Sequence, residues 1–208
     1  MGDDGSLIPI SDEQAKLGQE LVKAVRDASG YFTDILGDLP KDLIGYLIGD
    51  RVKAKRIERM AALWQRTRER LRDRGTDPEP PSLKYAIPIL EAAADEENEE
   101  LQDLWSRLLA AAMDPNRRDA MRQSFIATVK RMDPIDVLVF KAVCDNGPAQ
   151  FIPSAPDALA SKFKCSRDDV TVSIEHLAEL SCVSPSAPSF DQPRMKPFGT
   201  LLMNVVSG

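Results

Sequence analysis

The chain has 208 residues, which is enough for one or two domains with a buried core. Apolar residues make up 43% and charged residues 29%, as is usual for a globular protein. The net charge of −6 argues against a protein that binds nucleic acid over its whole surface. The three cysteines include no CxxC pair, so we expect reduced thiols and a cytoplasmic location.

The N-terminal region predicts a tail and two helices. Residues 1–10 are acidic and lack the long apolar run of a signal peptide, which predicts a disordered tail and no secretory signal. Ser11 and Gln14 predict a capping box, and apolar residues then recur at helical spacing. No run reaches the ~18 apolar residues of a transmembrane span. Residues 31–50, YFTDILGDLPKDLIGYLIGD, are apolar enough to embed at an anionic membrane surface, but we expect them to pack in the core.

Two helices of opposite charge come next. Residues 51–74 hold ten Lys/Arg against three Asp/Glu, whereas residues 91–103 hold seven acids and no base. The acidic residues belong to a single helix predicted from about residue 88 to residue 113. Like charges repeat every four residues on both helices and repel each other by roughly a few tenths of a kcal/mol per pair.

The cheapest relief of this repulsion is for the two helices to face each other, within the chain or across a dimer. Solvated faces and an external partner are the alternatives, because an exposed ion pair contributes little, about 0–1 kcal/mol. The residues of this candidate interaction surface are Arg51, Lys55, Arg59, Arg66, Arg70, Glu91, Asp95, Glu99 and Asp103.

The same helices carry apolar stripes whose core anchors are Trp64, Leu101, Trp105 and Leu108. On a helical wheel, Glu97 falls about 20° from the centre of the acidic helix's stripe. Arg68 falls on the apolar side of the basic helix. A buried carboxylate needs a partner, so we predict a buried ion pair between Glu97 and Arg68. The alternative is that Glu97 reaches solvent from the edge of the stripe.

After Asp133-Pro134 the sequence pattern changes to shorter predicted helices separated by loops. The elements predicted here are helices over about residues 119–132, 134–145, 157–164 and 167–180, with Ser166 as the cap of the last one, and an extended apolar tail. Three helices followed by an extended segment is the order of a winged helix-turn-helix. The prediction is therefore a mainly α protein: an N-terminal helical bundle over residues 11–132, then a winged-helix-like domain over residues 134–208.

Catalytic signatures are missing from the sequence. The single histidine, His176, lies between Glu175 and Glu179 with no cysteine at dyad spacing, so we expect a structural or surface residue. Glu96 and Glu100 resemble a cation-binding pair, but the ExxH partner usual in helical bundles is missing. No phosphate-binding loop, nucleophile elbow or HExxH motif occurs. We predict a non-enzymatic protein with no metal and no cofactor.

Nucleic acid is the alternative partner to protein. The basic helix offers cations to phosphates. The predicted recognition helix, however, carries four acids, among them Asp168 and Asp169, against Arg167, and such a surface repels DNA. A winged helix that docks protein fits better, so we expect a homodimer with an unknown protein partner.

Four stretches resemble one known family. IPILEAAADEENEELQDLWSRLLAAAMDP, residues 87–115, resembles the core motif of the bacterial abortive-infection alpha proteins. GDRVKAKRIERM, SFIATVKRMDPIDVLVF and MKPFGTLLMNVV are similar to other parts of that family, so the resemblance spans about residues 35–205. Lys196 stands where the family has threonine before a Pro-x-Gly turn. The resemblance implies a role in phage defence through abortive infection, and it brings no catalytic residues with it.

Overall fold

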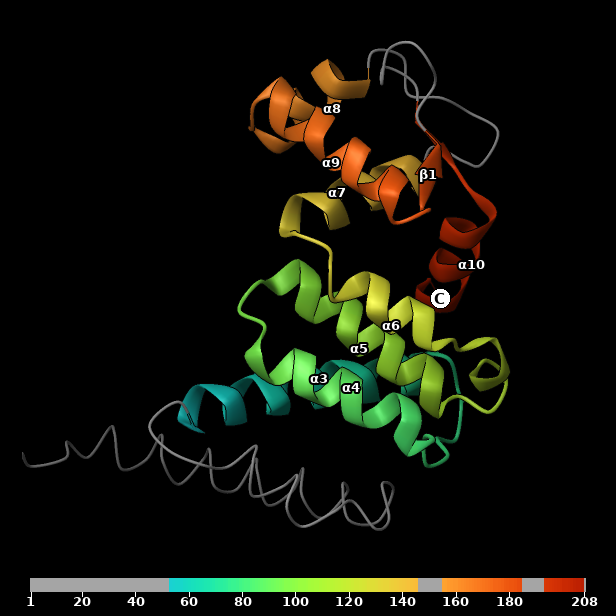
Figure 1. Ribbon diagram of the computed structural model, residues 1–208. Helices are drawn as coiled ribbons and strands as arrows, with labels where there is room; N and C mark the ends of the chain where they lie inside the picture. The colour runs from blue at the N-terminus through green and yellow to red at the C-terminus, as the bar shows by residue number, and fades with distance from the viewer. Residues whose placement is uncertain (1–52, 146–154, 185–192, 208) are drawn as a thin grey trace, which may run out of the picture.

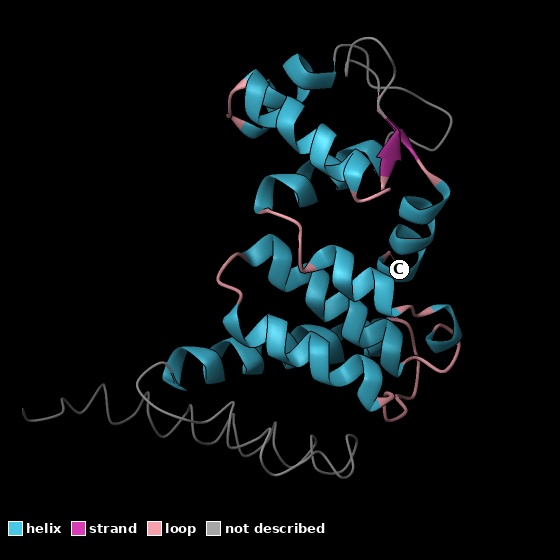
Figure 2. Ribbon diagram, in the orientation of Figure 1, coloured by secondary structure: helices cyan, strands magenta, loops and turns pink. Residues whose placement is uncertain are grey.

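The structure is a computed structural model that describes residues 53–145, 155–184 and 193–207. Helices dominate these residues, as predicted (Figures 1 and 2). The elements are α3 Lys53–Asp73, α4 Leu83–Asp95, α5 Glu99–Met113, the 3₁₀ helix η1 Arg118–Ala120, α6 Gln123–Val129, α7 Pro134–Asp145, α8 Ala155–Phe163, α9 Arg167–Glu179, β1 Val183–Ser184, β2 Arg194–Met195 and α10 Pro197–Val206. The tail predicted over residues 1–10, the first helix and the apolar segment 31–50 lie outside the described residues.

Helix α5 is the centre of the packing. It contacts α3, α4, α6, α7 and α10. Its second half, LWSRLLAAAM, carries one charged side chain, Arg107, so most of its circumference is free to be buried. Its large buried side chains are Leu101, Leu104, Trp105, Leu108, Leu109 and Met113. Burial of such a side chain contributes about 1.5–3 kcal/mol, so α5 stabilises the bundle from within.

The acidic helix predicted as one piece is two helices, α4 and α5. The chain is extended at Glu96, and Asn98 caps α5 by accepting from the backbone N–H groups of Glu100 and Leu101 over 2.9 and 3.3 Å. The side chain of Gln102 closes the break by donating to backbone carbonyls of the preceding segment. A run of like charges adds little helix stability, so a good cap is enough to break it.

The helix predicted over residues 119–132 is shorter than expected. The chain is extended at Met121 and Arg122, between η1 and α6. The hydroxyl of Tyr85 on α4 donates to the backbone carbonyl of Met121 over 2.9 Å, and the Met121 side chain is buried. These tertiary contacts hold two residues out of the helix that their sequence pattern favours.

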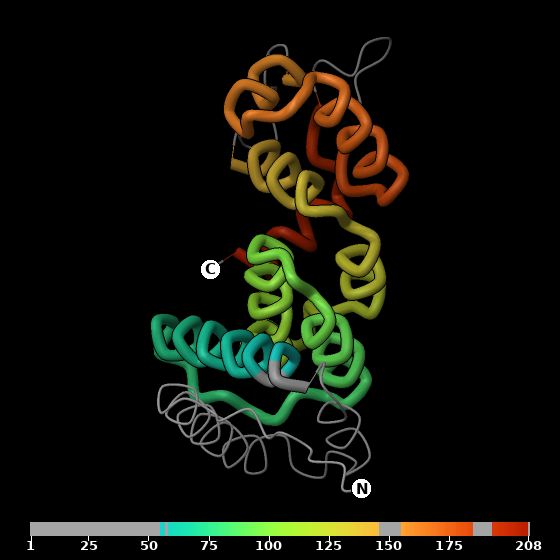
Figure 3. The backbone as a smooth tube through the Cα atoms, turned by 90° about the vertical axis from the view of Figure 1, so that its left-hand side faces the viewer, coloured from blue at the N-terminus to red at the C-terminus, as the bar shows by residue number. Residues whose placement is uncertain are grey.

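The molecule has two ends that the last helix joins. Figure 1 shows α3–α6 at one end and α7–α9 with the strands at the other, and Figure 3 shows the same division from the side. β1 and β2 pair antiparallel, with Val183 opposite Met195. The expected extended tail instead forms β2 and then a helix, because Pro197 stands at the first helical position, where its fixed φ is favourable. Helix α10 returns to the bundle and packs on α5.

The start of α10 lies tightly against Cys182, in the turn between α9 and β1. The backbone N–H of Lys196 donates to the carbonyl of Cys182 over 2.9 Å. A Cβ at Gly199 would lie 2.9 Å from the carbonyl carbon of Cys182 and closer still to its oxygen. Glycine is therefore needed at this position for the close approach of two backbones.

Candidate functional site

The predicted charge complementarity is present within the chain. Arg56 of α3 donates through Nε to Asp95, at the end of α4, over 2.6 Å. Arg59, one turn further on, donates to the carboxylate of Glu97 and, over 3.3 Å, to the carbonyl of Ala94. These bonds tie α3 to α4, so these arginines are already engaged before any partner arrives.

The predicted buried ion pair between Glu97 and Arg68 is wrong. Glu97 lies in the break between α4 and α5, its side chain is 75% exposed, and it is bonded to Arg59. Arg68 is nine residues beyond Arg59 on α3, which is about half a turn away, and it is exposed. The prediction assumed an unbroken acidic helix, and the break at Asn98 changes the direction in which Glu97 points.

Asp103 is the centre of a charged network that links three helices. Its carboxylate accepts from Arg70 of α3 and from Nε of Arg107 over 2.8 Å. Nζ of Lys141, on α7, lies 3.3 Å from Asp103 and 2.7 Å from Glu100. Burial disfavours the charged form of Asp103, but the hydrogen bond from Arg107 and the three neighbouring cations outweigh it. The pKa of Asp103 therefore lies below its ordinary value.

The other residues predicted for the interaction surface vary in exposure. Lys55 and Glu99 are exposed, Arg66 and Glu91 are half-buried, and Arg51 lies outside the described residues. The residues predicted as core anchors, Trp64, Leu101, Trp105 and Leu108, are all buried. The surface is thus an intramolecular seam with a few exposed charges along its edge.

Two arginines hold the last turn of α10 by its backbone. Arg107 donates through Nη1 to the carbonyl of Val206 over 3.0 Å. Nη1 of Arg117 lies 3.4, 3.5 and 2.5 Å from the carbonyl oxygens of Asn204, Val205 and Ser207. The last carbonyls of a helix lack partners within it and carry partial negative charge. The two arginines supply both the missing hydrogen-bond donors and the compensating positive charge.

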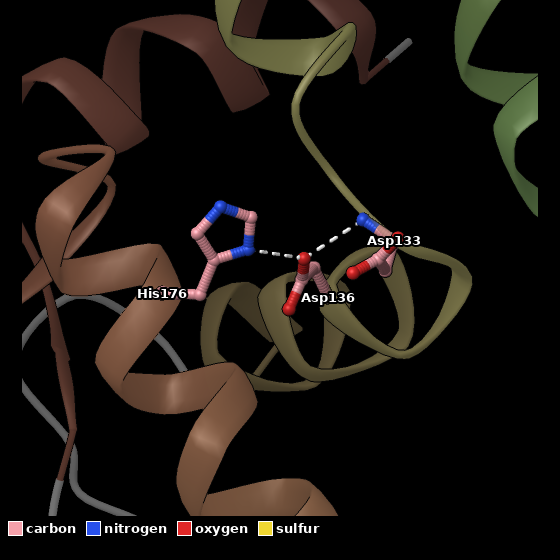
Figure 4. Close-up of side chains that lie close together, drawn as sticks. All are labelled: Asp133, Asp136 and His176. Carbon is pink, nitrogen blue, oxygen red and sulfur yellow. Dashed lines mark hydrogen bonds and ion pairs between the residues drawn. The ribbon is translucent and has the colours of Figure 1, made fainter.

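A second polar cluster joins α7 to α9 (Figure 4). Asp136 is 1% exposed, and its carboxylate has three donors. They are the backbone N–H of Asp133 at 2.8 Å, the hydroxyl of Ser173 at 2.6 Å and Nδ1 of His176 at 2.7 Å. Because a carboxylate can only accept, Nδ1 of His176 carries the proton of this bond. The cluster therefore gives His176 a structural partner.

Asp133, Asp136 and His176 also have the residue types of a metal site. Their ligand atoms lie within 4.8 Å of one another. Oδ2 of Asp136 already accepts hydrogen bonds from two N–H groups, and a bound cation would have to displace both. These contacts therefore favour a structural link between α7 and α9 over a metal site. Sequence reasoning missed Asp136, although an acid three residues after the residue that precedes a helix is a capping signal.

The outward face of α9 is acidic. Asp168, Glu175 and Glu179 are exposed and lie within about 60° of one another on the helix. Val172 shares this face and is 62% exposed, more than any other large apolar residue in the described ranges. Arg167, at the start of α9, pairs with Asp157 of α8. This face therefore presents negative charge around one apolar side chain.

Within the described ranges, no helix is both long and apolar enough to cross a bilayer. The apolar segment 31–50 falls outside those ranges.

Comparison with known proteins identifies a family. A family model described as abortive infection alpha matches residues 55–196, which is more than half of the chain. The chain belongs to the abortive infection alpha family. The part that matches this family runs from the first turn of α3 to the residue before α10, and it contains both polar clusters. No curated protein and no solved structure matches the chain.

Proposed function

We propose that this abortive infection alpha protein acts in phage defence as a non-enzymatic protein-interaction module, with α7–α9 and the β1–β2 ladder as a winged-helix-like docking unit. The observation that carries the proposal is the exposed face of α9, where acids surround Val172. An apolar side chain within a charged rim is typical of a protein-docking surface. The favoured partner is a protein with a cationic surface.

The contacts on α3 make nucleic acid a weaker candidate. Arg56, Arg59 and Arg70 already donate to acids of α4, α5 and the break between them. Counter-ion release at phosphates requires cations that are free to leave their partners. The acids of α9 would repel the same backbone, so protein docking remains the favoured function.

The same contacts bear on the expected homodimer. The sequence supported a dimer through complementary charges on two helices, and these charges pair within one chain. A cytoplasmic homodimer therefore stays a prediction that needs another surface. Light scattering of the purified protein at low and high salt measures it directly, and a monomer at both would exclude the dimer.

Charge reversal on α9 tests the docking proposal. In a bacterial host that expresses the protein, we expect the wild type to reduce phage propagation and Glu175→Lys with Glu179→Lys to lose that protection. Both residues are exposed, so circular dichroism and expression level should be unchanged. Asp119→Lys, which reverses an exposed acid on η1, is the matched control and should still protect.

If α9 instead binds nucleic acid, the same charge reversal should have the opposite effect. New lysines on a DNA-reading helix would strengthen retention on DNA and would preserve protection. Full protection by the double variant would therefore rule out docking through α9. A wild-type protein that does not restrain phage would rule out the defence role itself.

A further inference from the structure

Arg74 is a largely buried cation whose guanidinium has no hydrogen-bond partner among the described residues. Its side chain is 11% exposed, and Nε, Nη1 and Nη2 are all shielded from solvent. The backbone fixes its position, because Gly75, with φ of 62°, turns the chain at the end of α3. The N–H groups of Gly75 and Thr76 then donate to the carbonyls of Arg72 and Leu71.

The nearest carboxylate does not satisfy this arginine. Oδ2 of Asp114 lies 3.7 Å from Nη1 of Arg74 and 3.7 Å from Nε of Arg117, too far for a hydrogen bond to either. Oδ1 of Asp114 accepts from the backbone N–H of Asn116 over 2.9 Å. Two guanidiniums thus share one buried carboxylate, which leaves one positive charge in excess.

The surroundings make that excess costly. Burial lowers the pKa of Arg74 below its ordinary value, and the charge of Arg117 lowers it further. The two other arginines nearby have partners, because Arg70 and Arg107 both donate to Asp103. A buried charge is normally paired and hydrogen-bonded. Among the described residues Arg74 has only the 3.7 Å ion pair with Asp114, which it shares with Arg117, and no hydrogen-bond acceptor.

We propose that Arg74 and Arg117 form a binding site for a small oxyanion, a phosphate group that is either free or part of a phosphomonoester. The planar donors of a guanidinium match two oxygens of a phosphate. One such anion neutralises the excess charge and satisfies the nitrogen atoms of Arg74. The nitrogen atoms of Arg74 are closed to solvent. The anion therefore enters only when the side chain of Arg117, which is 31% exposed and also bonds the last carbonyls of α10, moves aside.

Titration with inorganic phosphate tests the site. At constant ionic strength in chloride buffer, we expect saturable broadening of the ³¹P resonance with the wild-type protein. Arg74→Met removes the donors and keeps an apolar stem, so it should weaken binding about tenfold or more. Arg122→Met, which changes an exposed arginine before α6, is the matched control and should bind as the wild type does. Phosphoserine and a nucleoside monophosphate, used in place of phosphate, show whether a phosphomonoester is preferred.

Thermal unfolding keeps the test decisive. Loss of a charge that is largely buried and makes no hydrogen bond should leave the Tm of Arg74→Met in chloride equal to or above that of the wild type. The wild type alone should gain from phosphate beyond the general salt effect. A lower Tm of the variant in both buffers would mean that Arg74 stabilises the C-terminal ends of α3 and α5. That result, or equal phosphate binding by the wild type and Arg74→Met, would overturn the site. Arg117→Gln provides a second variant, which should also weaken binding.

Discussion

Asp136 carries three hydrogen bonds on an almost fully buried side chain, so three donors depend on one residue. We expect Asp136→Ala to lower the free energy of unfolding by about 2–4 kcal/mol, because its donors lose their acceptor inside the protein. Urea unfolding measures the loss. Asp133→Ala removes an exposed side chain and keeps the backbone donor, so it should cost clearly less. Equal losses would contradict a structural role for Asp136.

Gly199 and Gly75 are needed for different reasons: the first by lack of space for a side chain, the second by its positive φ. Gly199→Ala would place a Cβ against the Cys182 carbonyl, and we expect a loss of about 1–3 kcal/mol or complete failure to fold. Gly75→Ala meets no atom within 4 Å and costs what a positive φ costs, about 1–2 kcal/mol. Denaturant midpoints compare the two variants. A tolerated alanine at Gly199 would mean that the turn after α9 and the start of α10 separate easily.

Asp103 makes the stability of the fold depend on pH in the acidic range. Its pKa in the folded chain is below the ordinary value of 3.8, so the unfolded chain binds the proton more readily. The stabilisation is therefore complete above the unfolded pKa and is lost as pH falls towards the folded one. Asp103→Asn should be less stable at neutral pH and should lose less stability than the wild type below about pH 4. Urea unfolding at several pH values checks this, with Asp119→Asn as an exposed control, and parallel curves would contradict it.

At the scale of the element, periodicity predicted which segments are helical but not where they break. The apolar stripe placed Trp64, Trp105 and Leu108 in the core, where they lie. The break at Asn98 depends on a local cap, and the extended residue Met121 depends on Tyr85 from a different helix. The spacing of apolar residues carries no information about either contact. Glu97 was therefore given the wrong partner, although opposite charges on α3 and α4 were correctly expected to pair.

The cluster of Asp136 and His176 was beyond the reach of the sequence for another reason. Its members are separated by about forty residues, and their contact exists only when α7 and α9 pack. Ser166 was predictable because its capping box lies within four consecutive residues, and the structure confirms it as the cap of α9. Local signals can be read from one sequence, whereas contacts between helices need the fold.

Helix α10 depends on cations from the bundle. We expect Arg117→Met to increase hydrogen exchange of the α10 amides by up to about tenfold, because roughly 1 kcal/mol of capping interaction is lost. Mass spectrometry of the exchanged peptides measures this, and α8 serves as the internal reference. Arg122→Met should leave α10 unchanged. Unaltered exchange in Arg117→Met would show that Arg117 adds nothing to what Arg107 and apolar packing provide.

At the scale of the whole molecule, α10 and the Asp103–Lys141 contact join the two ends. We therefore expect a single cooperative transition. Trp64 and Trp105 report on the bundle by fluorescence, and Cys182 reports on the other end. Burial raises the pKa of the Cys182 thiol to about 12, so it should react with thiol reagents after unfolding and not before. Different midpoints for fluorescence and for Cys182 labelling would show that the two ends unfold separately.

The way in which α10 is held has a consequence for how its sequence can vary. Arg107 and Arg117 bind main-chain oxygens, which every amino acid possesses. The outward side chains of this helix can therefore change freely, provided that its buried face stays apolar. Its length cannot. One inserted residue would move the last turn by about 1.5 Å along the axis and about 100° around it, away from both arginines. Among natural variants of this chain, insertions and deletions in the last helix should be far rarer than substitutions.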